Sequence, residues 1–500
     1  MIATTALVAV LTLCCSLYYL FTRTFNYWNI RDVANPKPVP LFGNLLDSAL
    51  RRKNIGDVFK EIYDQFPDEK VVGVYRMTTP ALLLRDLDVI KDVLIKDFDN
   101  FSDRGFSFSK NGLGNNLFHA ESDRWRILRS KFNPLFTSGK LKNMMYLLEE
   151  RGDKLLEYIQ NMERSEQDLL PIFKGYTMAT IVACSFGLDV ETINGETNIF
   201  KAMDVTIFSP SFLDELDMMF PIIFKTLKLN PMPQVVTEFF LQVVSTAIEK
   251  RNGVSTNRHD FMDLLITMKE EHILRLQKND GRDSSLTLEL TDDIIAAQAL
   301  AFYAGGYESS AITVSLAVYE LARNPEVQRE VIAEVDAVLA RHGGRLGAEA
   351  VSELELMERV LSETLRLYPV VEPLQRRALC DYKIPGTDVT VKKDQMVIVS
   401  TKGIHRDPKY YPDPDRFDPG RFTAENSKDR HTCAHMPFGV GPRYCIGMRF
   451  AKCQLKVCLA KFFSKFRVEP TAATPANISF KPRRVVMAPR EEVLVNILPR

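Results

Sequence analysis

The sequence predicts a mainly α-helical protein with small β-sheets and a transmembrane anchor helix at its N-terminus. Three observations support this fold class. The run from Ile2 to Phe21 contains no charged side chain. Residues 291–324 form a long helical pattern that is apolar on nearly every face. The β-like segments are short and few, so small sheets are expected beside a helical body.

The N-terminal apolar run is expected to cross a membrane. Twenty helical residues span about 30 Å, the thickness of one hydrocarbon core. A cleaved signal peptide is the alternative, but no basic residue precedes the run and no clear cleavage site follows it. The nearest basic residues are Arg23, Arg31 and Lys37, all on the C-terminal side. The positive-inside rule therefore places the rest of the chain in the cytosol behind an anchor at residues 1–22.

Composition describes a large globular body in a reducing compartment. The chain has 500 residues, of which 46% are hydrophobic, enough for a sizeable core. Basic and acidic residues balance at 64 each, which argues against a nucleic-acid-binding protein. The eight cysteines are spread thinly and do not resemble a disulfide framework.

A proline-rich hinge and a series of helices and strands follow the anchor. Alternating prolines between Pro36 and Asn44 favour an extended spacer within a hinge at residues 23–45. Periodic patterns predict helices at 124–132, 239–250 and 354–368. The β-like segments predict strands at 71–75, 81–84, 389–391, 396–400 and 493–498.

The best-defined predicted helix runs from Thr291 to Asn324. Thr291 suits its N-cap, and Asn324 is followed by a proline that ends the pattern. Within the buried middle of this helix the sequence AGGYESS places Gly305 and Gly306 beside Glu308, although glycines and a lone carboxylate are both costly there. One interpretation is close helix packing with a bridged glutamate. The other is an opening for a ligand, with Glu308 and the following serines Ser309 and Ser310 passing protons inward.

The segment PFGVGPRYCIGMRF raises the question of what Cys445 does. A disulfide does not fit a reducing compartment. A zinc site with His431, Cys433 and His435 lacks a second ligand pair at the usual spacing. A nucleophilic cysteine lacks a local histidine. The remaining interpretation is a thiolate ligand to a large metal cofactor.

The surroundings of Cys445 suit that interpretation. Gly441 and Gly447 allow tight turns and a close approach to a flat ligand. A helix predicted to start just after Cys445 and to run to about residue 466 would stabilise a thiolate through its N-terminal amides. Arg443 offers a positive charge for an acidic group of the cofactor, and Phe438 offers an apolar shield.

The stretch from Phe438 to Gly447 reads F-x-x-G-x-R-x-C-x-G and resembles the haem-binding loop of the cytochromes P450. This resemblance implies that Cys445 is the axial thiolate ligand of haem b iron, with Phe438, Gly439, Arg443 and Gly447 as further cofactor-binding residues. It implies the P450 fold and one haem-thiolate catalytic domain at 46–500, because the matching motifs between 125 and 447 serve one cofactor.

Other segments agree with the resemblance. Glu363 and Arg366 match the family's E-x-x-R motif, and PGRF supplies Arg421 for the expected structural triad, although Gly420 replaces the usual glutamate. Trp125 and Arg129 match the W-x-x-x-R pattern of the helix that reaches a haem propionate. By the same resemblance, Arg376 and Arg104 are further propionate-binding residues. Outside the family, any of these arginines would be read as an ordinary surface charge.

The glycine-rich helix resembles the family's oxygen-activation motif. The resemblance makes Glu308 and Ser309 the catalytic acid–alcohol pair, with Ser309 in place of the usual threonine. Serine keeps the hydroxyl but loses the methyl group that restricts its rotamer, so the coupling of oxygen use to product formation is open.

Finer matches at 131–142, 260–265 and 405–419 resemble the insect microsomal branch, which is close to the mammalian drug-metabolising enzymes. The implied activity is insertion of one oxygen atom from O₂ into xenobiotics such as insecticides or plant toxins, or into lipophilic hormones. NADPH would supply electrons through a flavoprotein reductase, with cytochrome b5 as a further partner. The implied location is the endoplasmic reticulum membrane, with the catalytic domain facing the cytosol. Six basic residues are candidates for a docking face: Arg126, Lys131, Lys140, Lys142, Arg449 and Lys452.

Family alignment also implies an apolar substrate chamber, although such side chains are equally common in an ordinary core. The segment from 208 to 229 is a candidate channel lid or second membrane contact. Two rival functions stay open: a reductase-independent haem-thiolate isomerase or dehydratase, and a haem-binding sensor without turnover. The predicted substrate-binding residues are Phe106, Phe108, Phe118, Gly305, Val370, Val371, Leu374 and Val485.

Overall fold

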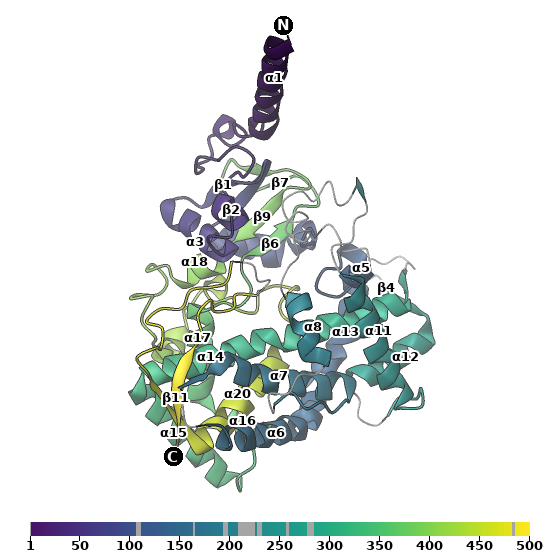
Figure 1. The fold of residues 1–500 in the computed structure, drawn as a ribbon, viewed down its shortest axis with the longest axis vertical. Helices are drawn as coiled ribbons and strands as arrows, with labels where there is room; N and C mark the ends of the chain where they lie inside the picture. The colour runs from purple at the N-terminus through teal and green to yellow at the C-terminus, as the bar shows by residue number, and fades with distance from the viewer. Residues whose placement is uncertain are drawn as a thin grey trace.

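A computed structural model describes residues 2–106, 112–163, 166–193, 199–208, 226–227, 233–256, 260–277, 285–482 and 486–500. The fold is mainly helical with small sheets, which confirms the predicted class (Figure 1). Phe108, Val485 and most of the candidate lid lie outside the described residues.

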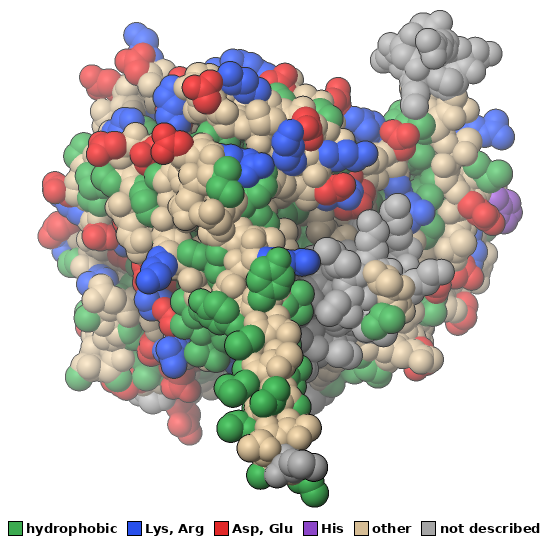
Figure 2. All heavy atoms as spheres, turned by 90° about the horizontal axis from the view of Figure 1, so that it is seen from above, with side chains coloured by type: hydrophobic (Ala, Val, Ile, Leu, Met, Phe, Trp, Pro, Cys, Tyr) green, Lys and Arg blue, Asp and Glu red, His purple; other side chains and the backbone are tan. Residues whose placement is uncertain are grey.

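The N-terminal helix α1 (Ile2–Thr22) projects from the body as a single rod (Figure 1). None of its residues is buried, and its apolar side chains line the projecting rod in Figure 2. Helix α7 (Leu169–Phe186) is also long and apolar enough to cross a membrane, but 83% of its apolar window is buried inside the protein. Of these two described helices, α1 is therefore the candidate anchor, as the sequence predicts.

The segment after α1 is docked on the body, whereas the sequence predicts an extended spacer. Trp28 is fully buried, and its indole N–H donates to the Val74 carbonyl at 3.1 Å. Further along, Asn44 donates from its side chain to the Pro36 carbonyl at 3.2 Å and from its backbone to the Tyr75 carbonyl at 2.9 Å. The segment therefore lies against the sheet that contains Val74 and Tyr75. Hydrogen bonds and the buried Trp28 ring hold it there.

That sheet lies directly beneath the anchor (Figure 1). Its strand order is β1-β2-β9-β6, in which β2 pairs in parallel with β9 and the other two pairings are antiparallel. Burial on both faces explains the nearly continuous apolar sequences of β2 and β9. The bounds are β1 (Val71–Arg76), β2 (Thr79–Leu84), β6 (Leu374–Arg377) and β9 (Met396–Val399).

Three smaller sheets complete the β-structure. The predicted strand at 493–498 is found as β11, which pairs with β10 and β3, and the prediction at 389–391 corresponds to the two-residue strand β8. The bounds are β3 (Glu166–Asp168), β4 (Ile273–Gln277), β5 (Ser285–Glu289), β7 (Tyr382–Lys383), β8 (Thr390–Val391), β10 (Phe466–Pro470) and β11 (Leu494–Pro499).

The helices form the larger body below the sheet, with α14 packed against α7, α17 and α20. The predicted helices at 124–132, 239–250 and 354–368 correspond to α5, α11 and α17. The remaining bounds are α2 (Leu46–Ala49), α3 (Ile55–Gln65), α4 (Leu87–Lys91), α5 (Ser122–Phe132), α6 (Ser138–Gln160), α8 (Ile199–Phe208), α11 (Gln234–Glu249), α12 (Phe261–Glu271), α13 (Asp292–Gly306), α14 (Glu308–Arg323), α15 (Pro325–Arg341), α16 (Ala348–Ser352), α17 (Glu355–Leu367), α18 (Thr401–His405), α19 (Ala424–Ser427) and α20 (Met448–Lys465).

The long helix predicted from Thr291 to Asn324 is two consecutive helices. Thr291 caps α13, since its side chain accepts from the Ile294 N–H at 3.4 Å, as predicted. The break falls at Tyr307, whose ψ of −78° departs from helical geometry directly after the two glycines. The fold thus interrupts this largely buried pair of helices directly after the glycine pair that the sequence singles out.

Candidate active site

Cys445 lies in a loop just before the N-terminus of α20. Its backbone N–H donates to the Phe438 carbonyl at 2.8 Å, which closes the loop onto itself. Gly439 and Gly441 have φ of 70° and 69°, a left-handed conformation that favours glycine. The start of α20 at Met448 confirms the predicted helix after the cysteine.

The glycines of this loop differ from expectation. A side chain on Gly441 would overlap the Leu94 carbonyl, so this glycine is required by packing against protein rather than by a flat ligand. Gly447 has φ of −86°, and a Cβ there would meet Phe136 at an ordinary 3.7 Å. The contribution of Gly447 is its backbone N–H, which hydrogen-bonds the Cys445 sulfur.

The Cys445 thiol experiences opposing influences. Burial by the surrounding protein raises its pKa, although the side chain keeps solvent-accessible surface. The Gly447 N–H and the positive charges of Arg129 and Arg104 lower the pKa, without overcoming burial. The protein therefore surrounds this thiol with groups that stabilise a thiolate, the form that ligates a metal ion.

Four arginines are grouped near Cys445, since their charges influence one another and those of Arg104 and Arg129 reach its sulfur. Their guanidinium groups donate to main-chain carbonyls: Arg443 to Ser102 and Ala120, Arg129 to Tyr444, Arg376 to Gln375, and Arg104 to Phe118. In the described part of the chain, no ion pair joins any of the four to a carboxylate. One nitrogen each of Arg129, Arg376 and Arg443 is buried without a hydrogen-bond partner there.

The cluster is electrostatically unfavourable by itself. Burial and, to a smaller extent, the charges of Arg104 and Arg376 lower the pKa of Arg443 to about 8. Burial also lowers the pKa of Arg104 to about 9 and that of Arg376 to about 10. Buried cations with unsatisfied donors call for an anion. The cluster therefore fits a cofactor that carries carboxylates, as the propionates of haem do.

Trp125 supports this cluster through its ring. The Arg443 guanidinium lies 4.3 Å from the centre of the indole, and Phe98 packs on the indole with ring centres 5.4 Å apart. A cation over an aromatic face gains about 0.5–2 kcal/mol. Trp125 thus positions Arg443.

Phe438, the predicted apolar shield, is partly buried and packs against the larger hydrophobic core.

The two glycines of the interrupted helix have different surroundings. A Cβ on Gly306 would overlap Ile181 of α7, whereas a Cβ on Gly305 would meet nothing within 4 Å. The packing interpretation is therefore confirmed at Gly306, and the ligand opening stays a prediction, which Gly305 has the space to accommodate. Gly306 serves close helix packing, and Gly305 leaves open space beside Ser309, whose hydroxyl donates to the Gly305 carbonyl at 2.7 Å.

Glu308 packs against α7 rather than facing solvent. It is fully buried and lies 3.1 Å from the Lys174 ammonium, which also lies 3.0 Å from Asp204. The bridged glutamate is therefore present, as the packing interpretation expects. Lys174 and Asp204 were not identified from the sequence, because only the fold brings α7 and α8 to this helix.

The predicted substrate residues are only partly brought together. Phe106 and Phe118 lie with ring centres 5.9 Å apart, and both rings contact His119 edge-on. Phe118 and Val371 each keep 39% exposure, whereas Val370 is 5% exposed and belongs to the core. Leu374 is half-buried in β6 and packs against the hydrophobic core around the main sheet. His119 is an aromatic neighbour that no sequence pattern indicated.

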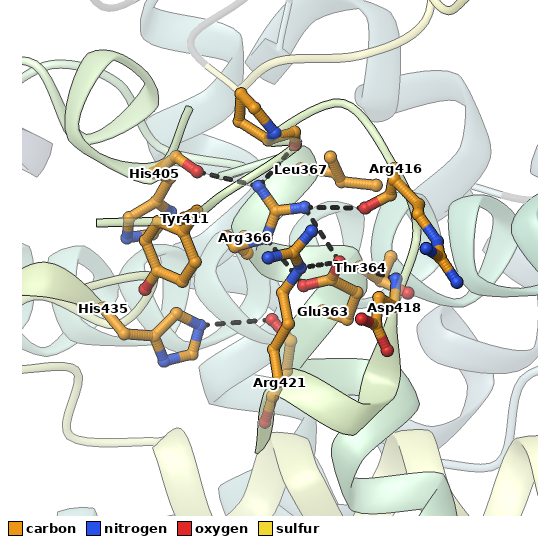
Figure 3. A network of polar contacts seen from close by, with 12 residues as sticks. Glu363, Thr364, Arg366, Leu367, His405, Tyr411, Arg416, Asp418, Arg421 and His435 are labelled. Carbon is orange, nitrogen blue, oxygen red and sulfur yellow. Dashed lines mark hydrogen bonds and ion pairs between the residues drawn. The ribbon is translucent and has the colours of Figure 1, made fainter. Parts of the chain in front are cut away.

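The predicted triad residues meet in one buried network (Figure 3). Arg366 makes two bonds to the Glu363 carboxylate, at 2.6 and 2.8 Å, and both residues are fully buried. Arg421 lies 3.5 Å from the same carboxylate despite the glycine before it. The remaining Arg366 donors reach the carbonyls of His405, Pro414 and Arg416. These bonds tie α17 to the segment 405–416, which precedes the Cys445 loop in the sequence.

The zinc alternative finds no support in the described residues. His435 donates to the Ser362 carbonyl, and the His431 ring accepts from the Cys433 N–H, so each ring has another role. Burial raises the pKa of Cys433 to about 12, which opposes a thiolate. Among the residues that the structure describes, no three His, Cys, Asp or Glu side chains are grouped to hold a metal.

Comparisons with known proteins agree with this geometry. A family model described as Cytochrome P450 matches residues 33–496. Cytochrome P450 6B1 of Papilio polyxenes is 49% identical over 486 residues, which cover 97% of each chain. Cytochrome P450 6B2 of Helicoverpa armigera is 47% identical over 487 residues, covering 97% of this chain and 96% of that protein. Cytochrome P450 6a2 of Drosophila melanogaster is 34% identical over 485 residues, covering 94% and 95%.

Proposed function

The chain belongs to the cytochrome P450 family and is a haem-thiolate monooxygenase of the insect branch, and we propose that Cys445 supplies the thiolate. The observation that supports this assignment is the environment of the Cys445 sulfur. It accepts a hydrogen bond from the Gly447 N–H and lies near the positive charges of Arg129 and Arg104. Haem, when bound, supplies the iron at which O₂ is activated for transfer of one oxygen atom to the substrate. The Gly447 amide would tune how strongly the sulfur donates electrons.

The arginine cluster would hold the cofactor's two propionates. Arg129, Arg376 and Arg443 each offer one buried donor that lacks a described partner, Arg104 adds its charge beside them, and carboxylates accept such donors in charge-assisted bonds. Binding of the propionates would remove the mutual repulsion that lowers the pKa of Arg443 and Arg104. The same contacts would fix the orientation of the ring plane within the fold.

Ser309 and Glu308 would divide the proton transfer between two sides of one helix. The Ser309 hydroxyl lies on the open side and can pass a proton from its oxygen toward the reacting atoms. Glu308 lies on the packed side, where Lys174 and Asp204 connect it to α8. We propose that this acid–base chain supplies the protons that Ser309 delivers.

We propose lipophilic small molecules as substrates, either xenobiotics such as insecticides and plant toxins or endogenous hormones. Support comes from the paired rings of Phe106 and Phe118 and from the partly exposed side chains of Phe118 and Val371, which offer apolar surface to such a molecule. The similarity to insect cytochromes P450 supports the proposal of xenobiotic substrates. Phe108 and Val485 keep their predicted role as lining residues.

Electrons would come from NADPH through a flavoprotein reductase, with cytochrome b5 as a second donor, at the cytosolic face of the endoplasmic reticulum. The anchor α1 and its single hydrophobic span support this location. Within the predicted docking face, Lys140 and Arg449 have no described ion pair. Its other basic residues pair with acids on their own surface: Arg126 with Asp99, Lys131 with Glu271, Lys142 with Glu349 and Lys452 with Glu358.

The carbon monoxide difference spectrum of the reduced protein tests the thiolate assignment. We expect a strongly red-shifted Soret band that Cys445→Ala abolishes. Cys453→Ala is the matched control, since this cysteine lies on α20 and is half-buried, and it should leave the band intact. A histidine-type band in the unmodified protein would contradict the assignment. NADPH-dependent oxygen uptake with added reductase then separates a monooxygenase from an isomerase or a sensor.

A further inference from the structure

Asp103 is a buried carboxylate to which the proposed chemistry gives no role. Its side chain is 1% exposed. One oxygen accepts from the Ser122 backbone N–H at 2.6 Å and from the Ser102 hydroxyl at 3.0 Å. The other accepts from the Ser122 hydroxyl and from the Arg377 guanidinium, both at 3.0 Å. A charge buried at such cost and so completely bonded points to a specific task.

The backbone beside Asp103 carries strain. Ser122 is the first residue of α5 and has φ of 46°, in the left-handed region that costs energy for any residue with a side chain. Three contacts to the Asp103 carboxylate hold it there. The Ser122 conformation sets the direction in which α5 leaves the loop, and α5 carries Trp125 and Arg129.

The same carboxylate joins two further segments of the site. Asp103 directly precedes Arg104 in the chain, and Arg377 directly follows Arg376 in β6. Their backbones pair as an isolated bridge, with the Arg377 N–H donating to the Asp103 carbonyl at 2.8 Å. Asp103 thus connects the three segments that carry Arg104, Arg129 and Arg376.

The fourth arginine, Arg443, depends on the same group of residues, Asp103, Ser122 and Arg377, which we call the junction. The two carbonyls that hold Arg443 belong to Ser102 and Ala120, which flank the residues of the junction in the sequence. Asp103 and Glu121 are also the acids whose negative charges raise the pKa of Arg443, against burial and the neighbouring arginines. The junction therefore gives the cluster both its geometry and part of its counter-charge.

We infer that Asp103 is a positioning residue that fixes the four arginines for the carboxylates of the cofactor. This inference rests on the proposed function, in which those arginines bind the haem propionates. Asp103 itself would not touch the cofactor. It would act through the entry angle of α5, through the pairing of its backbone with β6, and through its charge.

The test compares how fast haem and haem dimethyl ester leave the holoprotein for an excess of a haem-scavenging apoglobin. The ester has the same ring and iron but no ionised carboxylates. Asp103→Asn keeps the size of the side chain and removes its charge. We expect haem to leave about tenfold faster, the usual scale for a partner behind a ligand contact, while the ester leaves at nearly the unmodified rate. Equal acceleration for both cofactors would mean a purely structural role and overturn the inference.

Glu121→Gln is the matched control, because Glu121 also lies 3.0 Å from the Arg377 guanidinium but leaves the Asp103–Ser122 bonds in place. We expect a smaller effect than for Asp103→Asn, and an equal effect would refute positioning in favour of charge alone. If Asp103→Asn does not fold with haem, Ser122→Ala provides the comparison, since it removes only the hydroxyl bonds and keeps the backbone bond.

Arg376→Gln separates this inference from the proposed function. If it accelerates the loss of haem but not of the ester, the arginines bind the propionates, and an unchanged rate in Asp103→Asn then overturns only the inference. If haem and its ester leave at the same rate, both from Arg376→Gln and from the unmodified protein, the propionate assignment is wrong and the inference falls with it.

Discussion

At the scale of single residues, Gly305 and Gly306 show where sequence reasoning stops. The sequence indicates that two glycines in a buried helix are unusual, and the structure interrupts the helix directly after them. It does not indicate that one faces α7 and the other faces open space, because that depends on the rotation of the helix in the fold. Likewise, the pattern around Cys445 identified the thiol, whereas Lys174 and Asp103 have no local signal.

The two glycines yield a paired prediction. Gly306→Ala should unfold more easily than Gly305→Ala, by about 1–3 kcal/mol, because only its Cβ must displace Ile181. The gain in helix propensity is common to both variants and cancels in the difference. Urea unfolding of the two proteins measures it, and Ile181→Val should restore part of the loss in the Gly306 variant. Equal stabilities would contradict the assigned packing.

At the scale of elements, the sequence predicted several helices and strands but not how the N-terminal segment sits. Periodicity located α5, α11, α17 and three of the four strands of the main sheet, β1, β2 and β9, since these patterns reflect burial of one or both faces; β6 was not predicted. Proline spacing predicted an extended, semi-rigid spacer but did not indicate its docking: Trp28 is buried against Gly73, where any side chain would overlap the indole. A long-range fit between an aromatic ring and a glycine leaves no local pattern.

Trp28 should therefore matter for the stability of the whole body. Trp28→Ala removes a fully buried indole and its bond to Val74, so we expect a loss of about 3–5 kcal/mol in the free energy of unfolding. Ile30→Ala is the control within the same turn, because Ile30 is 73% exposed and its truncation should cost little. Unfolding in detergent measures the stability of both variants. It is followed by far-ultraviolet circular dichroism, whose signal does not depend on the removed tryptophan. A stable Trp28→Ala protein would mean that the segment is a free linker.

At the scale of the whole molecule, a net charge of zero conceals an uneven distribution. Four arginines are grouped near one cysteine, and two histidines, His405 and His435, stack beside the triad with ring centres 5.2 Å apart (Figure 3). Composition excluded a nucleic-acid binder but carries no information on such burial. The family resemblance supplied the arginines in advance, whereas the histidine pair came only from the structure.

The histidine pair predicts how stability depends on pH. Burial lowers the pKa of His435 to about 3, and burial with the charges of His435 and Arg366 lowers the pKa of His405 well below its usual value. The unfolded chain takes up protons on both rings below about pH 6.5, and the native state does not. These two groups therefore destabilise the protein as pH falls from about 6.5, by about 1.4 kcal/mol per pH unit for each proton.

Glu372 opposes this trend over part of the range, because burial raises its pKa to about 7 and the native state then binds the extra proton. The informative quantity is consequently the difference between the unmodified protein and His435→Gln, which cancels every group the two share. We expect the stability gap between them to shrink steadily between pH 6.5 and 4.5, measured by urea unfolding at each pH. His342→Gln, at the end of α15 where the ring contacts Glu353 at 2.7 Å, is the control and should not reproduce that slope. A pH-independent gap would mean that His435 is protonated in the folded protein, and the buried neutral pair would then be wrong.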